Sequence, residues 1–159
     1  MGLPDRVRAF LAHTRFVPTP VYRLMVLAWA VSGLLQILYG APSSVRQTAP
    51  PWFDWAFVVA QLLSSTFVLV GLYYVEENLD PTITEDEALI YNGRLRVSLT
   101  LELMGIIGLQ TVVAVQMASV WFDYGRPPAA GTSWMAILFA LYLCFRERDI
   151  LTAQRKLAP

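Results

Sequence analysis

The run VSLTLELMGIIGLQTVVAVQMASVWF, residues 97–122, decides how this chain can fold. It exceeds the ~20 apolar residues with which a helix crosses a hydrocarbon core of about 30 Å. Three more apolar runs accompany it, at residues 21–40, 55–75 and 132–145. The sequence therefore predicts an all-α, polytopic membrane protein with four transmembrane helices in a bundle.

The composition favours the same fold class. Of the 159 residues, 56% are hydrophobic and only 15% are charged, whereas roughly a quarter are charged in ordinary soluble domains. A soluble domain of this size has too much of its mass near the surface to hide four apolar runs from water. We therefore expect the lipid bilayer to be the main partner, together with further copies of the chain or a larger membrane complex.

The supply of reactive side chains restricts the chemistry. The chain has one histidine, His13, and one cysteine, Cys144, which excludes an intrachain disulfide and leaves little for a zinc site. A serine hydrolase needs a histidine beside its nucleophile, and His13 lies in the terminal segment. No Gly-rich phosphate loop with its lysine is present, and a formal net charge of zero gives no reason to expect nucleic acid. We predict no enzymatic activity, no cofactor and no metal site.

The predicted domains follow from the apolar runs. Residues 1–20 form a basic segment, expected to be a short amphipathic helix in the headgroup region or else a poorly ordered tail. Residues 21–145 form the transmembrane domain, and residues 146–159 form a charged cytoplasmic tail that we expect to continue as helix. The fourth run is short, at about 21 Å of helix. We expect it to gain length from snorkelling of Arg146 and Arg148, to tilt less than its neighbours, or to thin the bilayer.

Two polar connections join the first three spans. Residues 41–54 read as a turn-rich connection, and residues 76–96 form a loop with six acidic residues. In this loop the sequence TEDE, residues 84–87, has the form of a capping box, which predicts a short helix beginning at Thr84. The Asn92-Gly93 pair is expected to end that helix before the third span. The acids could also bind a divalent cation, but their spacing does not match a calcium loop, so we favour a helix cap on a solvated face.

The basic residues predict the orientation in the membrane. Ten of the twelve lie in the N-terminal segment, the central loop or the C-terminal tail: Arg6, Arg8, Arg15, Arg23, Arg94, Arg96, Arg146, Arg148, Arg155 and Lys156. The other two, Arg46 and Arg126, lie in the remaining loops. Because basic residues are retained on the cytoplasmic side, both termini are predicted to be cytoplasmic. Four of the five tryptophans then fall at the outer interface, as an aromatic belt requires: Trp52, Trp55, Trp121 and Trp134.

Small and polar residues recur along one face of three spans. They are Ser98, Glu102, Gly105, Leu109, Val112, Gln116 and Ser119 in the third span, Phe57, Gln61, Ser64, Val68 and Gly71 in the second, and Trp29, Gly33, Gln36 and Gly40 in the first. In lipid such faces mark helix contacts, because an amide that faces acyl chains is left without a hydrogen bond. The candidate residues are therefore Glu102, Gly105, Gln116, Gln61, Gln36 and Gly33. They either hold the helices together, which we favour, or line a pore or an oligomer contact.

Glu102 is the strongest single candidate, because an ionisable group inside a span is functional by default. It lies about one turn after Ser98, near the predicted cytoplasmic boundary, with Arg94 and Arg96 upstream. We favour snorkelling, or pairing with one of these neighbouring arginines, over a role in ion coupling.

The layout resembles that of small four-span membrane proteins of actinobacterial phages, some of which are holins. The resemblance is carried by the arginine-rich segment before VYRLMVLAWAVSGLLQILYG, by the acidic loop between the second and third spans, and by the short last span that runs into FRERDILTAQRKL. It implies a place in the bacterial inner membrane and a function in which monomers associate and open lesions that release a cell-wall hydrolase. It assigns no role to any single residue.

Two other functions are compatible with the same sequence. One is a structural or regulatory subunit of a membrane complex, or an exclusion factor. The other is a small ion-coupled transporter that uses Glu102.

Overall fold

The computed structural model describes residues 20–74 and 85–157, and within these ranges the chain forms helices and turns with no strand. The described elements are α2 (Pro20–Tyr39), α3 (Ser43–Thr48), α4 (Pro51–Tyr73), α5 (Glu85–Tyr124) and α6 (Gly131–Leu157). The all-α prediction is confirmed for this part of the chain. The predicted N-terminal segment and most of the acidic loop, including Thr84, lie outside the described residues.

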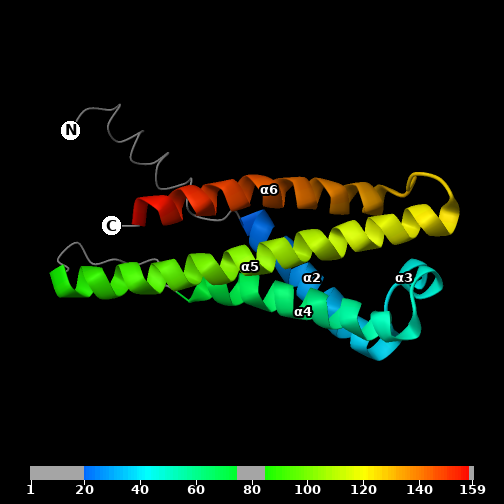
Figure 1. Cartoon of the computed structure of the whole chain (residues 1–159), viewed down its shortest axis with the longest axis horizontal. Helices are drawn as coiled ribbons and strands as arrows, with labels where there is room; N and C mark the ends of the chain where they lie inside the picture. The colour runs from blue at the N-terminus through cyan, green and yellow to red at the C-terminus, as the bar shows by residue number, and fades with distance from the viewer. Residues whose placement is uncertain (1–19, 75–84, 158–159) are drawn as a thin grey trace.

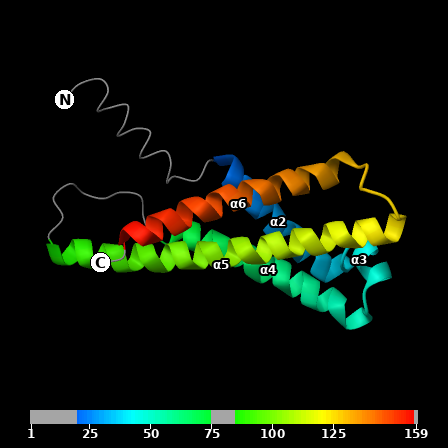
Figure 2. The same cartoon turned by 45° about the horizontal axis from the view of Figure 1, so that its top comes forward.

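The central element is α5. It runs the length of the molecule, with α4 along one side and α6 along the other (Figure 1). Helix α2 packs on α4 and crosses at an angle behind α5 in both views (Figure 2). Helix α3 and the turn between α5 and α6 lie at one end of the molecule, and the C-terminal end of α6 lies at the other (Figure 1).

Three helices in the described part of the chain are long and apolar enough to cross a membrane. They are α2, α4 and the stretch Gly93–Tyr124 of α5. The fourth predicted run lies in α6, which does not meet the same criterion. Its apolar residues are followed in the same helix by Arg146, Glu147, Arg148 and Asp149. The described part of the chain therefore has three helices of membrane-spanning character and a fourth long helix of mixed character.

Glycine and proline set the ends of the first two long helices. Gly40 has a φ of 85°, which residues with a side chain rarely adopt, and its N–H donates to the carbonyl of Gln36 at 2.8 Å to close α2. Pro51 is the first residue of α4, where a missing N–H costs no helical hydrogen bond. Helix α4 thus begins at residue 51 and not at the predicted residue 55. Residues 43–48 of the predicted turn form α3.

The expected helix break at Asn92-Gly93 is wrong, because α5 continues without interruption from Glu85 to Tyr124. A glycine inside a helix costs only about 1 kcal/mol relative to alanine. Arg94 and Leu95, which have good helix propensity, follow this glycine, and the next turns of α5 pack on α4 from Ser98 onward. Tertiary contacts therefore outweigh the local preference for a stop.

The expected helical continuation of the last span is confirmed. Helix α6 runs for 27 residues, through the charged tail to Leu157. The expected snorkelling of Arg146 is wrong, because this side chain lies in the interior at 6% exposure. Arg148, two residues later, is exposed.

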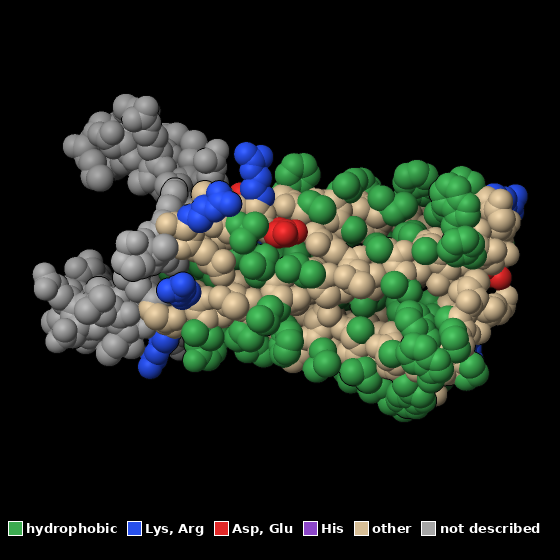
Figure 3. Space-filling view, viewed as in Figure 1, with side chains coloured by type: hydrophobic (Ala, Val, Ile, Leu, Met, Phe, Trp, Pro, Cys, Tyr) green, Lys and Arg blue, Asp and Glu red, His purple; other side chains and the backbone are tan. Residues whose placement is uncertain are grey.

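Two groups of buried apolar side chains form the core. The larger one joins all four long helices through residues such as Val26, Val68, Ile106 and Leu143. The smaller one lies near α3 and includes Val45, Phe57 and Val112. Outside the core, apolar side chains cover the middle of the molecule and the end near α3, and basic side chains gather mainly at the opposite end (Figure 3).

Candidate functional site

A buried ion pair joins α5 to α6. The guanidinium of Arg146 donates to both carboxylate oxygens of Glu102, from Nε to Oε1 at 2.8 Å and from Nη2 to Oε2 at 3.0 Å. Glu102 is 2% exposed and Arg146 is 6% exposed. Two parallel charge-assisted hydrogen bonds fix both the distance and the relative orientation of the two side chains.

Helix α2 contributes a third group to this pair. The hydroxyl of Tyr22 donates to Oε1 of Glu102 at 3.2 Å, and Tyr22 is buried. Its ring also lies 5.5 Å from the ring of Tyr142 on α6. We call Tyr22, Glu102 and Arg146 the charge cluster. It joins three helices whose residues are far apart in the sequence.

The partner expected for Glu102 is wrong. Arg94 and Arg96 are exposed and lie on the same helix as Glu102, eight and six residues before it, respectively. Eight residues of helix rise by about 12 Å, which separates the groups along the axis. Arg146 follows directly after the apolar run of α6. It reaches the carboxylate of Glu102 because α6 runs back along α5.

A second polar group lies between α2 and α4. The side-chain amide of Gln61 donates to the backbone carbonyl of Trp29 at 2.9 Å, and the amide of Gln36 donates to Oε1 of Gln61 at 3.1 Å. Gln61 is completely buried. We call Trp29, Gln36 and Gln61 the amide cluster. It confirms that facing glutamines bond each other, as expected for the first two spans.

Small residues bring α4 and α5 into backbone contact. A Cβ atom placed on Gly105 would lie 2.5 Å from the carbonyl oxygen of Ser64, and one placed on Gly71 would lie 2.7 Å from the amide nitrogen of Glu102. The hydroxyl of Ser98 donates across this contact to the carbonyl of Gly71 at 2.6 Å. Gly33 plays the same part between α2 and α4, because a Cβ there would lie 2.9 Å from the side chain of Leu62.

The structure thus separates the six sequence candidates into groups. Glu102 belongs to the charge cluster, Gln36 and Gln61 belong to the amide cluster, and Gly105 and Gly33 lie at helix contacts. Gln116 is half-buried about four turns beyond Glu102 on α5, outside both clusters. Five of the six candidates therefore lie at contacts between helices of one chain, and Gln116 does not belong to these groups.

Tyr22 and the pairing of Arg146 were missed from the sequence. The available signals are weak. A tyrosine in the first turn of an apolar helix is common at a membrane boundary, and an arginine at the end of an apolar run ordinarily reaches for water. Only the arrangement of the helices shows that both side chains meet the one acid inside a span.

The described residues offer little else for chemistry. No three His, Cys, Asp or Glu side chains in this part of the chain come close enough together to hold a metal ion. The sulfur of Cys144 is exposed and lies 3.4 Å from the side-chain amide of Gln110. Comparison of the chain with protein-family models, with curated proteins and with solved structures finds no match.

Proposed function

We propose that this protein crosses the bacterial inner membrane four times, with both termini in the cytoplasm, and permeabilises it by self-association in the manner of a holin. The three apolar helices support this topology, and so does α6, which runs antiparallel to α5 for 27 residues (Figure 1). The distribution of basic residues gives the orientation.

The observation that carries the functional proposal is the ion pair between α5 and α6. Each chain contains one acid and one complementary base inside its apolar region. A charge inside a membrane helix is costly unless it is paired, so each of these groups favours a partner of opposite charge. If α6 moves away from α5, the cheapest new partner for each charge is the opposite charge of a neighbouring copy.

This exchange gives a route from a closed monomer to an assembly. In the closed monomer Gly33, Gln61 and Gly105 on the small and polar faces of α2, α4 and α5 are buried at contacts between these helices. Release of α6 uncovers the side of α5 that carries Glu102, and association of several copies then replaces one intrachain pair with pairs between chains. A ring of such charge pairs is able to admit water.

The test is inducible expression in a bacterial host with continuous measurement of membrane potential and growth. We expect an abrupt collapse of the potential after a delay. Glu102→Gln should change the time of collapse, and the charge exchange Glu102→Arg with Arg146→Glu should restore it towards the wild-type time. An intact potential at high expression would rule out the proposal.

A second candidate function, a subunit of a larger membrane complex, is supported by a different surface. Between α5 and α6 the amide of Gln110 lies 3.4 Å from Oε2 of Glu147, and both side chains are only partly buried. A polar pair at this position is suited to hydrogen bonding with a neighbouring helix. Stoichiometric recovery of one partner on affinity purification, lost in Gln110→Leu, would favour this function.

Transport through Glu102 has less support. Both carboxylate oxygens accept hydrogen bonds from Arg146, and Oε1 also accepts one from Tyr22. A proton or cation that binds this acid must first break the ion pair.

A further inference from the structure

Two pockets meet where α5 turns into α6. The first has a volume of about 460 Å³ and is lined by apolar side chains, among them Met117, Ala118 and Trp121 of α5 and Trp134 and Ile137 of α6. The second, which we call the polar pocket, has a volume of about 320 Å³ and a mixed lining of small or apolar residues and the polar residues Ser44, Tyr124, Arg126 and Ser133. Pro127 and Pro128 line both.

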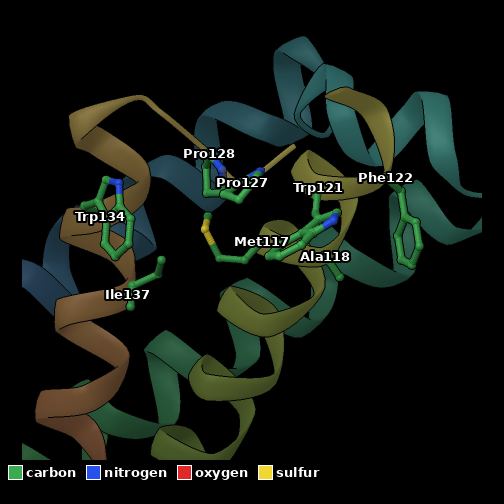
Figure 4. A pocket seen from close by; sticks show the side chains of 8 residues that line it. All are labelled: Met117, Ala118, Trp121, Phe122, Pro127, Pro128, Trp134 and Ile137. Carbon is green, nitrogen blue, oxygen red and sulfur yellow. The ribbon is translucent and has the colours of Figure 1, made fainter. Parts of the chain in front are cut away.

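The shape of the apolar pocket follows from the separation of the two helices. Side chains of α5 and side chains of α6 lie on opposite sides of it, and the two prolines lie across its end, next to Met117 (Figure 4). Its volume is within the range of about 300 to 1,000 Å³ that small-molecule sites occupy. A flexible hydrocarbon chain suits such a site, because the lining offers hardly any polar group to a more polar ligand.

The position of the pockets relates them to the membrane surface. Trp121 and Trp134 are the kind of residue that lies at the headgroup level, and both line the apolar pocket. Met117 and Ala118 lie about one turn deeper on α5. The apolar pocket therefore extends from the interface towards the hydrocarbon, while the polar pocket lies beside the loop.

The polar pocket has the donors that a phosphate group requires. Arg126 is exposed and supplies a guanidinium, and the hydroxyls of Ser44, Ser133 and Tyr124 surround the same space. The other basic residue near this end, Arg46, is used elsewhere, because its guanidinium packs beside Gly40 at the C-terminus of α2. Asp123, which precedes the loop, lines neither pocket.

We propose that this end of the protein binds one anionic phospholipid of the outer leaflet, with an acyl chain between α5 and α6 and the phosphate at Arg126. The proposal adds a ligand to the function proposed above and rests on the same four-span topology. It does not depend on whether the protein permeabilises the membrane. Because the acyl chain of the bound lipid lies between α5 and α6, the lipid stabilises the contact between these two helices.

The test is native mass spectrometry of the full-length protein in detergent with equal amounts of phosphatidylglycerol and phosphatidylcholine. We expect one phosphatidylglycerol per chain, bound several-fold more than phosphatidylcholine. Arg126→Gln should lower this preference about fivefold, as expected for one basic residue near an anionic headgroup.

Two matched variants test the chain-binding pocket. Ala118→Phe fills the pocket and should remove most bound lipid of either kind. Ala114→Phe adds the same ring one turn earlier on an exposed position of α5, outside the pocket, and should leave binding unchanged. Equal binding of the two lipids by the wild type, or equal effects of the two phenylalanine variants, would overturn the proposal. A dimer in the same spectra that disappears with Ala118→Phe would also overturn the proposal, because the pocket would then be occupied by a second copy of the protein and not by a lipid.

The outcomes separate this proposal from the proposed function. An intact membrane potential in cells together with selective binding of phosphatidylglycerol would reject the holin-like function and support the lipid site. A collapse of the potential without selective lipid binding would do the reverse.

Discussion

Helix α5 contacts its two long neighbours in different ways. Against α4 the contact is made by glycine, serine and backbone atoms, with Gly105 facing the carbonyl of Ser64. Against α6 the contact is made by side chains: apolar ones such as Leu143, the ion pair of Glu102 and Arg146, and a weak hydrogen bond between Gln110 and Glu147. The apolar pocket also lies between α5 and α6.

The difference shows two ways to hold helices together where water provides no hydrophobic force. Close backbone approach gains dispersion energy over many atoms and offers no easy alternative partner. An ion pair depends on two side chains. Either side chain can pair equally well with the corresponding side chain of another copy of the protein. The α4–α5 contact is therefore expected to be permanent, and the α5–α6 contact to be exchangeable.

The largest effect is expected from removal of the buried charge on α6. Arg146→Gln leaves the carboxylate of Glu102 in the interior without its guanidinium, and we expect a loss of about 3 to 5 kcal/mol in the free energy of unfolding. Steric trapping in lipid bicelles measures this quantity.

The matched control removes both charges. Glu102→Met combined with Arg146→Met leaves no isolated charge, and we expect it to keep most of the wild-type stability. If the double variant were as unstable as Arg146→Gln, shape at these positions and not charge would hold α6 in place.

A somewhat smaller effect is expected at the backbone contact of α4 and α5. In Gly105→Leu the new side chain meets the backbone of Ser64, so the helices must separate, and we expect a loss of about 3 kcal/mol or less. The same trapping measurement applies, and cross-linking between α4 and α5 reports their separation.

Gly93 provides the control on the same helix. A Cβ placed there has no neighbour within 4 Å, so Gly93→Ala should raise stability by up to about 1 kcal/mol through the gain in helix propensity. The same loss of stability in both variants would contradict the assignment of Gly105 to a close helix contact.

The smallest effect is expected from the amide cluster. Gln61→Leu removes the hydrogen bonds to Trp29 and Gln36, and we expect a loss of about 1 to 2 kcal/mol, the upper range for such bonds in membranes. Gln116→Leu, outside the cluster, should change stability by less than about 0.5 kcal/mol. A thermal unfolding series in detergent is sufficient to rank the two variants.

The helices and most packing residues could be predicted from the sequence, because apolar runs and periodic small residues are local features. Gly33, Gly105, Gln36 and Gln61 all lie at contacts between helices, as their spacing indicates. The failure at Asn92-Gly93 has a physical reason. A local cost of about 1 kcal/mol does not end this helix, because the turns that follow Gly93 pack on α4 from Ser98 onward.

The partner of Glu102 could not be predicted by the same means. A local pattern shows only residues that are near one another in the chain, and Arg146 follows Glu102 by 44 positions. The arginine also ends an apolar run, where the usual expectation is that it extends to water. The angle at which α6 returns along α5 decides between these outcomes, and that angle depends on contacts along the whole length of both helices.

The ion pair also has a consequence for biosynthesis. At about 5 to 20 residues per second, Arg146 is made about 2 to 9 seconds after Glu102. During this interval the acid lies in an apolar helix before its counter-ion exists. Helix α6 then leaves the ribosome with more charges than a segment that enters the membrane unaided. On the proposed topology a product truncated before Arg146 would contain the apolar run of α6 but would leave the carboxylate of Glu102 without its guanidinium.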